Sequence, residues 1–215
     1  MEKYKTIERE ISYEFTEKKS RFIGWIAPVA SQEEFSELLE RKKKQYWDAT
    51  HNCSAVIIGA KKEFMRFSDD GEPQGTAGLP MLEALKQSGL TDLLAVATRY
   101  FGGTLLGAGG LVRAYSKSVA GALKAAEEQG AVLEMIPSAA YDAVLPYAAY
   151  GKLENLLAQR GYQKQDVRFE QDVAVRILVD AELEKTFLKD MTEAFCGSVE
   201  PKRVLECYAK RYCKK

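Results

Sequence analysis

Glycines and basic side chains gather between residues 99 and 117, in a pattern that could bind an anion. The segment reads RYFGGTLLGAGGLVRAYSK and follows an apolar run suited to a buried strand. Apolar positions at helical spacing come after the glycines, so the segment joins a strand to a helix. In such a turn, backbone N–H groups can face a ligand, and the free N–H groups and dipole of the helix start favour negative charge. The glycines are Gly102, Gly103, Gly107, Gly109 and Gly110.

Two cations follow in the helix itself. Arg113 and Lys117 are one helical turn apart, so they lie on one side of the helix near its start. A cation at that end opposes the helix dipole, typically by about 0.3–1 kcal/mol, and departures from local rules tend to mark a site. We therefore expect Arg99, Arg113 and Lys117 to hold a phosphate or carboxylate. The alternative is that the glycines allow tight packing and the arginines pair with an acidic loop.

That acidic loop is the segment SDDGEPQGTAGLP at residues 68–80. Asp69, Asp70 and Glu72 surround a glycine turn, and their clustered carboxylate oxygens could hold a divalent cation such as Mg²⁺. The same carboxylates could neutralise Arg99 and Arg113 instead. We favour this second interpretation because no complete Ca²⁺-loop pattern follows. We accordingly expect no metal and no other cofactor.

Two further candidates belong to the same region. Gly75 and Thr76 lead into a helix that extends through Leu85, with Thr76 as the expected N-cap. This second glycine-bearing helix start could share an anion with the first. The only histidine, His51, stands at the beginning of a strand. Because the sequence shows no partner for His51, we favour a structural role over a catalytic one.

Composition limits the kind of protein. The chain has 215 residues, which suits two modest domains. Its 31 basic and 31 acidic side chains balance, so nucleic acid would have to be bound by a local patch. No apolar run approaches the roughly 20 residues that span a bilayer, and the N-terminus lacks the apolar core of a signal peptide. The 4 cysteines show neither CxxC nor zinc-binding spacing, so we expect a cytoplasmic protein with reduced thiols.

Apolar periodicity predicts an α+β chain that divides at Met135-Ile136-Pro137-Ser138. An αβ unit is complete before this proline and a new pattern begins after it, so the expected domains are residues 1–136 and 137–215. The second domain has the order βαββαβ, which is ferredoxin-like. Its strand at 173–177 lacks the aromatic side chains on which many RNA-binding modules of this order stack bases. The expected strands lie near 4–15, 21–29, 52–59, 64–67, 93–96, 131–134, 141–145, 162–169, 173–179 and 199–208, and the expected helices near 31–44, 76–85, 111–123, 153–161 and 183–195.

Several segments resemble the signature of the YigZ/IMPACT family. They are RYFGG at 99–103, LG at 106–107, GLVRAY at 110–115, DDGEP at 69–73, GTAG at 75–78, SRF at 20–22 and HNC at 51–53. The resemblance covers the whole chain and adds Arg21 and His51 to the candidate site. It implies an N-terminal α/β domain of the left-handed βαβ kind found in a ribosomal protein, elongation factor G and GHMP kinases. It also implies a C-terminal ferredoxin-like domain similar to the last domain of elongation factor G.

The resemblance implies a role in translation, because the eukaryotic relatives regulate translation initiation under stress by binding a ribosome-associated protein. Some bacterial relatives have been labelled peptidases, which the residues do not support. There is no GxSxG, SxxK, HExxH or P-loop GxxxxGK pattern. The glycines also fail the dinucleotide pattern GxGxxG, because Val112 stands where the third glycine belongs. The sequence therefore names no catalytic residue.

Three functions remain open. The leading hypothesis is a non-enzymatic protein that binds RNA or ribonucleoprotein in translation regulation, with phosphates at the glycine-rich segment. The second is an enzyme or sensor for a phosphorylated metabolite or nucleotide, with Mg²⁺ at Asp69 and Asp70. The third is a protein-interaction module whose partner is a ribosome-associated protein. None of the three involves a membrane.

Overall fold

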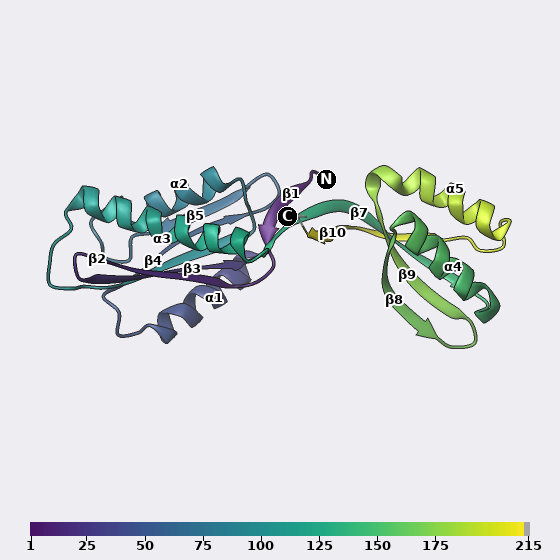
Figure 1. Cartoon of the computed structure of the whole chain (residues 1–215), viewed down its shortest axis with the longest axis horizontal. Coiled ribbons are helices and arrows are strands. Elements are labelled where there is room, and N and C mark those ends of the chain that lie inside the picture. The colour runs from purple at the N-terminus through teal and green to yellow at the C-terminus, as the bar shows by residue number, and fades with distance from the viewer. Residues whose placement is uncertain (213–215) are drawn as a thin grey trace. The chain divides into compact units, whose positions relative to one another are not determined.

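The computed structural model describes residues 1–212, so Cys213 and the rest of the basic C-terminus lie outside the described residues. The chain is α+β, with its strands in two sheets. It divides into two compact units, which are described separately (Figure 1). The N-terminal unit comprises Lys3–Glu134 with Tyr212, and the C-terminal unit comprises Met135–Arg211 with Met1–Glu2.

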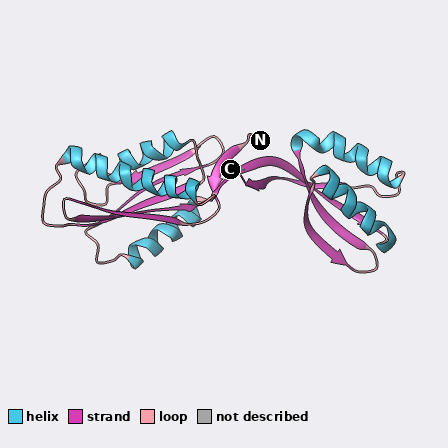
Figure 2. Ribbon diagram, in the orientation of Figure 1, coloured by secondary structure: helices cyan, strands magenta, loops and turns pink. Residues whose placement is uncertain are grey.

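A five-stranded antiparallel sheet forms the centre of the N-terminal unit, with the order β2-β3-β6-β4-β5. Figures 1 and 2 show α2 and α3 on one face of this sheet and α1 on the other. The middle strands are apolar on both sides because helices cover both sides. The strands of this sheet are β2 (Ile11–Glu17), β3 (Ser20–Pro28), β4 (His51–Ile58), β5 (Phe64–Ser68) and β6 (Leu93–Tyr100), and the helices are α1 (Gln32–Gln45), α2 (Gly78–Ser88) and α3 (Ala108–Glu128). Strand β1 (Tyr4–Ile7) belongs to the other sheet.

The larger core of this unit lies between the sheet and the helices α2 and α3. Tyr115 on α3 and Phe22 on β3 are fully buried there, with their rings edge to face at 5.5 Å. Gly24 allows α3 to lie directly on β3, since a Cβ at this position would be 2.2 Å from the Ser118 carbonyl oxygen. This close approach fixes the helix that carries Arg113 against the sheet.

Two predictions about the beginning of the chain have different outcomes. Helix α1 starts after Ser31, whose Oγ accepts the Glu34 N–H at 3.1 Å, which confirms the predicted cap. The single strand predicted at 4–15 is instead two strands, β1 and β2. Between them the Glu8 N–H donates to the Ala131 carbonyl oxygen at 2.8 Å. The two strands belong to different sheets, so one continuous strand does not form.

A two-residue turn joins β2 to β3. Glu17 pairs with Ser20, so only Lys18 and Lys19 lie between the strands, with φ of 45° and 65°. A hairpin turn with positive φ at both central residues is favoured by Asn-Gly. A side chain in this left-handed region costs about 1–2 kcal/mol. Both lysines therefore make the turn less stable than Asn-Gly would.

The C-terminal unit has the element order βαββαβ that the sequence predicted. Strand β9 lies between β7 and β8 in its sheet, and β10 also pairs with β7. Alternate residues of β9 are buried, from Val173 to Val179, and pack with α4 and α5 in one core. The elements are β7 (Val132–Leu145), α4 (Tyr147–Arg160), β8 (Gln163–Phe169), β9 (Val173–Asp180), a short 3₁₀ helix (Ala181–Leu183), α5 (Glu184–Phe195) and β10 (Lys202–Tyr212).

Strand β7 corrects the predicted gap between two strands. The sequence placed a boundary at Met135–Ser138, between strands at 131–134 and 141–145, but β7 runs from Val132 to Leu145 without interruption. Pro137 does not end the strand, because proline fixes φ near −65°, which extended backbone tolerates, and removes only one donor. The two compact units divide within this strand, between Glu134 and Met135.

The sequence predicts no membrane span and reduced thiols, and the described residues bear on both predictions. None of the helices in residues 1–212 is both long enough and apolar enough to cross a membrane. Cys53, Cys196 and Cys207 are free thiols. Burial raises the pKa of the Cys53 thiol to about 12, so this thiol stays protonated at neutral pH.

Candidate functional site

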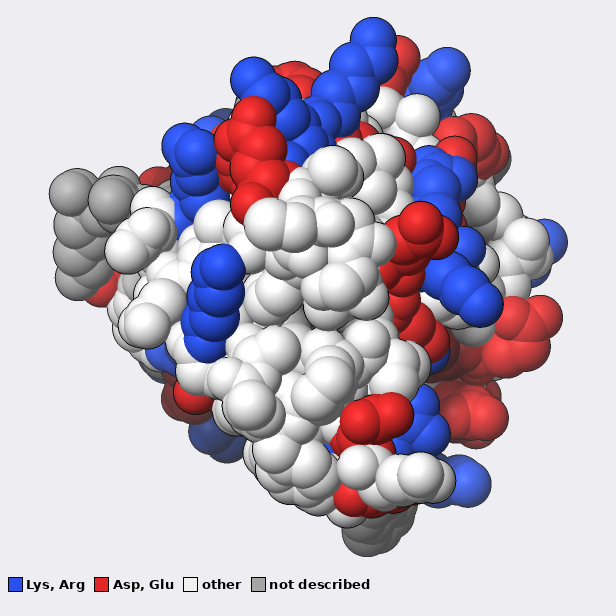
Figure 3. Space-filling model, turned by 90° about the vertical axis from the view of Figure 1, so that its right-hand side faces the viewer, with Lys and Arg blue, Asp and Glu red and all other residues white. Residues whose placement is uncertain are grey.

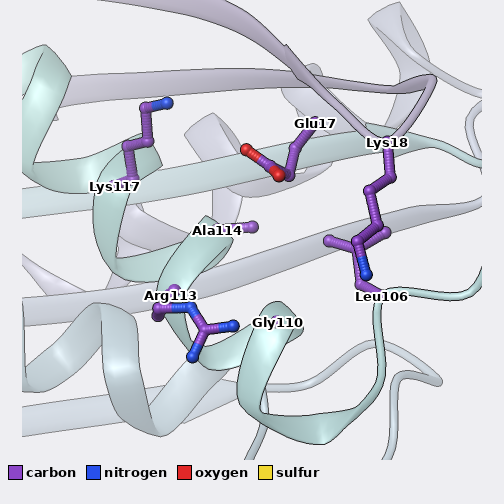
Figure 4. Close-up of a pocket in the computed structure, with 7 residues that line it drawn as sticks. All are labelled: Glu17, Lys18, Leu106, Gly110, Arg113, Ala114 and Lys117. Atoms are coloured by element: carbon purple, nitrogen blue, oxygen red, sulfur yellow. The ribbon is translucent and has the colours of Figure 1, made fainter.

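Two pockets adjoin at Leu106, in the glycine-rich loop of the N-terminal unit. The first, the basic pocket, has a volume of about 220 Å³ and lies beside α3 (Figure 4). It is lined by Glu17, Lys18, Leu106, Gly110, Arg113, Ala114 and Lys117. The second, the apolar pocket, has a volume of about 420 Å³. It is lined by Thr50, His51, Gly71, Glu72, Pro73, Arg99, Phe101, Leu105, Leu106, Gly107, Ala108 and Leu111.

The wall of the basic pocket carries three cations and one carboxylate. Figure 4 shows Arg113 and Lys117 extending from α3, with Lys18 across the pocket on the turn between β2 and β3. The Lys117 Nζ is 4.3 Å from the centre of the Phe15 ring. Within residues 1–212, Arg113 forms no ion pair or hydrogen bond. The structure thus places Arg113 and Lys117 on one pocket wall, as their spacing predicts, and leaves Arg113 without a protein partner there.

Helix α3 begins at Ala108, and no side chain among the described residues caps it. Gly107 adopts a φ of 75°, and its carbonyl oxygen accepts the N–H groups of Gly110 and Leu111 at 3.0 and 2.9 Å. The first turn, all of it described, contains no acidic residue, so the protein does not offset the positive end of the dipole there. Arg113 lies in the second turn, where it opposes the dipole less than a cation in the first turn would.

Helix α2 differs, because a carboxylate from the acidic loop caps it. Asp69 accepts three backbone N–H bonds at the beginning of this helix. The donors, at 2.8, 3.0 and 2.8 Å, are the N–H groups of Gly75, Ala77 and Gly78. Burial raises the pKa of Asp69, but these bonds outweigh burial and hold the pKa below its ordinary value. The predicted N-cap is wrong, since the Thr76 hydroxyl donates to the Pro73 carbonyl oxygen at 2.6 Å instead.

The second aspartate of the loop is also committed to protein donors. Asp70 accepts hydrogen bonds from Lys43 Nζ at 2.9 Å and from the Asn52 N–H at 2.7 Å. Neither Asp70 nor Asp69 forms the ion pair with an arginine that the sequence interpretation expected, as far as residues 1–212 show. In the same residues, no group of three or more His, Cys, Asp or Glu side chains is arranged to hold a metal ion. The geometry therefore gives the magnesium alternative no support.

A buried ion pair links the acidic loop to the sheet and to α3. Arg99 Nη1 on β6 donates to Glu72 Oε1 at 2.7 Å, and the Tyr115 hydroxyl donates to the same oxygen at 2.7 Å. The side chains of Arg99 and Glu72 are only 6% and 3% exposed. Burial raises the pKa of Tyr115, so its O–H remains available as a donor. Glu72 is thus the member of the acidic loop that neutralises Arg99.

The other two nitrogen atoms of the Arg99 guanidinium differ in their hydrogen bonding. Its Nη2 donates to Ser20 Oγ at 3.3 Å, whereas its buried Nε has no hydrogen-bond partner among the described residues. The guanidinium carbon lies 5.6 Å from the centre of the Phe22 ring and 5.4 Å from that of Phe101. A buried donor without a partner is costly. Because Arg99 lines the apolar pocket, an acceptor on a ligand could supply the missing bond.

His51 gains partners that the sequence did not reveal, and Arg21 lies elsewhere. His51 Nδ1 is 2.9 Å from the Asp70 carbonyl oxygen, which only accepts, so Nδ1 carries a proton. His51 Nε2 is 3.8 Å from Glu72 Oε1, at the wall of the apolar pocket. Arg21 lies outside both linings and forms a two-bond pair with Glu14, at 2.6 and 2.9 Å.

The five glycines of the segment serve different purposes. A Cβ at Gly102 would be 2.0 Å from the Lys19 carbonyl oxygen, so Gly102 lets the loop pack against the turn between β2 and β3. Gly103 requires a left-handed backbone, with φ of 79°. Among these five described glycines, Gly110 lines the basic pocket and Gly107 lines the apolar pocket. The anion-binding interpretation therefore fits Gly110 best, and tight packing accounts for at least one other.

Lys18 and Phe101 at the pockets, and Tyr115 beside Glu72, are among the residues that sequence reasoning missed. A pair of lysines in a hairpin turn that favours Asn-Gly could have pointed to Lys18. No such signal points to Phe101, since its exposure depends on how the loop folds. Tyr115 was interpreted as part of an apolar helix face, and its bond to Glu72 joins segments that are far apart in sequence.

Comparison with known proteins places this site in a family. Residues 18–123 match the Impact N-terminal domain, and residues 144–198 match a domain of unknown function, DUF1949. The chain is 40% identical over 199 residues to the IMPACT family member YvyE of Bacillus subtilis, covering 93% of this chain and 90% of that protein. The chain belongs to the IMPACT family.

Other relatives agree with this family assignment. The IMPACT family member YigZ of Escherichia coli is 35% identical over 185 residues, which is 85% of this chain and 89% of that protein. A crystal structure of a hypothetical protein is similar at a TM-score of 0.61 and 32% identity, covering 95% of this chain and 98% of that one. Within this IMPACT protein, the matched N-terminal domain includes every pocket-lining residue except Glu17.

The buried pair predicts that Glu72→Gln lowers the free energy of unfolding by about 3–5 kcal/mol, because it leaves the Arg99 charge buried without a counter-charge. Urea denaturation measures this change. The control is Glu14→Gln, which removes the charge partner of the exposed Arg21 and should leave stability near that of the wild type. Equal effects of the two substitutions would contradict the buried pair.

The cap on α2 predicts a pH-dependent effect of Asp69→Asn. The native pKa of Asp69 is lowered from 3.8, so its stabilisation is present above the unfolded pKa and is lost as pH falls through the native pKa. At pH 7 the substitution should lower the free energy of unfolding by about 0.5–2 kcal/mol. That difference should shrink below about pH 4.

Urea denaturation between pH 3 and pH 7 tests this expectation, with Glu37→Gln on the exposed face of α1 as the charge-matched control. The control should show no comparable loss at either pH. A wild-type melting temperature that rises with Mg²⁺, and no longer does so in Asp69→Asn, would instead support the magnesium alternative.

Proposed function

We propose that this IMPACT protein is a non-enzymatic binder of RNA or ribonucleoprotein that acts in translation in the cytoplasm, and that RNA phosphates lie in the basic pocket. The observation that carries the proposal is Arg113, a cation beside an uncapped helix start, which has no ion pair or hydrogen bond within residues 1–212. A phosphate there would interact with Arg113, Lys117 and Lys18 together.

The turn that carries Lys18 adds independent support. Lysines occupy both left-handed positions of this turn although the backbone favours Asn-Gly there. A local cost of this kind tends to persist where a side chain is needed for function. Gly102 packs the glycine-rich loop against Lys19, which keeps the turn beside that loop. The cation of Lys18 thus faces α3 at a cost to the stability of the hairpin.

The charge of the whole chain agrees with a local site rather than a broad one. Formal net charge is +0. Figure 3 shows the end of the molecule formed by the C-terminal unit, where basic and acidic side chains lie around a largely uncharged area. Association through a few phosphates is therefore the form of RNA binding that fits. We also assign the N-terminal unit to the left-handed βαβ fold and the C-terminal unit to the ferredoxin-like fold, which its element order supports.

Two other functions have less support. An enzyme or sensor for a phosphorylated metabolite would use the same cations, but its Mg²⁺ ligands Asp69 and Asp70 are bonded to protein donors. A protein-interaction module remains the second candidate, because the family resemblance implies a ribosome-associated protein partner. Binding of RNA by the purified chain separates the leading proposal from that candidate.

Arg113→Glu should weaken RNA binding strongly without loss of stability. The change replaces a phosphate-facing cation with an anion. It also creates a Glu–Lys pair one turn apart with Lys117, which adds a few tenths of a kcal/mol to helix stability. Fluorescence anisotropy with a labelled oligouridylate measures binding, and urea denaturation measures stability.

The matched control for this test is Lys124→Glu, which makes the same change of charge on α3 outside both pockets. Lys124 is exposed and lies near Glu128, so this control should bind RNA nearly as the wild type does. The salt dependence of binding should decrease in Arg113→Glu and not in the control. Equal losses in both variants would show a general charge effect and would contradict a site at Arg113.

The double substitution Lys18→Asn with Lys19→Gly should stabilise the protein and weaken RNA binding. Asn-Gly suits the turn, so the free energy of unfolding should rise by about 1–2 kcal/mol. Lys19→Gly alone is the control, since it relieves backbone cost but keeps the Lys18 cation. If the double variant binds the labelled oligouridylate as tightly as that control does, Lys18 is not a phosphate ligand.

A further inference from the structure

We propose that the apolar pocket binds an unpaired RNA base whose neighbouring phosphates lie in the basic pocket, so that the protein selects single-stranded RNA. This inference rests on the proposed function and names the form of RNA that it recognises. Three observations carry it: an exposed aromatic ring at the pocket wall, polar side chains that could meet the edge of a base, and the adjacency of the two pockets at Leu106.

The aromatic ring belongs to Phe101, which is 46% exposed although it is large and apolar. It lines the apolar pocket together with Leu105, which is 82% exposed. Exposed aromatic rings bind single strands by stacking, and every base offers a face for this contact. The Arg99 guanidinium lies 5.4 Å from the ring centre on β6, which holds Phe101 beside a fixed positive charge.

Two polar side chains in the same lining suit the edge of a base. Arg99 Nε is a buried donor without a partner among residues 1–212, in a side chain that is more than nine-tenths buried. His51 donates from Nδ1 to the Asp70 carbonyl oxygen, and its Nε2 is the remaining polar atom of a ring that lines the pocket. Bases present donors and acceptors along their edges, and a paired base has already used those of its Watson–Crick edge. A pocket that takes both the face and the edge of a base therefore requires an unpaired one.

The two pockets adjoin, because Leu106 lines both. One strand of RNA can therefore place a base beside Phe101 and its phosphates near Arg113 and Lys18. The volume of about 420 Å³ lies within the range of pockets that enclose small organic groups. A peptide side chain would also fit apolar walls, but adjacent cations favour a polyanion over a neutral chain.

The experiment compares a labelled oligouridylate of about 12 nucleotides, a length within the range that one nucleic-acid-binding domain covers, with an RNA duplex of the same length. Phe101→Ala should weaken binding of the single strand by about 5- to 150-fold, the loss expected for one stacked base. The matched control is Phe67→Ala, because Phe67 is 48% exposed in the same unit and lies outside both pockets. That control should bind the single strand nearly as the wild type does, and the wild type should bind the duplex more weakly.

The outcomes separate the two proposals. If Phe101→Ala and Phe67→Ala bind the single strand equally, or if the wild type binds the duplex as tightly, the base pocket is wrong. The phosphate site would survive that result, provided that Arg113→Glu still abolishes binding. If the wild type binds neither RNA at low salt, both proposals fail and a protein partner becomes the better explanation. Thermal melting of both phenylalanine variants verifies that any lost binding does not reflect unfolding.

Discussion

The buried ion pair between Arg99 and Glu72 is the constraint on which the candidate site depends. It joins the end of β6 to the acidic loop, and the Tyr115 hydroxyl joins the same carboxylate to α3. Two charges so deeply buried are tolerable only when they are paired with each other. Any movement of one segment would therefore separate charges in a medium of low dielectric. The loop, the strand and the helix that border the pockets are held as one body.

The acidic loop caps the start of one of the two nearby helices and not the start of the other. Asp69 satisfies the N–H groups at the start of α2, while the start of α3 has no capping side chain in the described residues. A helix end without a cap is normally satisfied by water or by a ligand. In a chain of formal net charge +0, this asymmetry concentrates positive potential at one place. The proposed phosphate site would use this end of α3 without the long-range repulsion of a basic surface.

Local patterns in the sequence predicted the helices and strands better than they predicted the contacts between residues far apart in the chain. The cap of α1 and the order βαββαβ followed from spacing, because both depend on residues close together in the chain. The N-cap of α2 did not, since Asp69 reaches that helix from upstream and displaces Thr76 from the expected role. The partner of Arg99 could not be chosen among three adjacent carboxylates, because the choice depends on how β6 and the loop meet. The gap between strands predicted at Pro137 is wrong for a different reason, because an extended strand accommodates the φ of proline.

The central position of β6 has a consequence for synthesis on the ribosome. The hairpin of β2 with β3 and the hairpin of β4 with β5 are both complete in sequence before β6, yet β6 is the strand that lies between them. At about 5–20 residues per second, the chain between β5 and β6 takes roughly 1–5 s to emerge. During this interval β3 and β4 expose unpaired apolar edges, which are prone to pair with other chains. A nascent chain of this fold is therefore exposed to mispairing at that point, whatever the stability of the finished sheet.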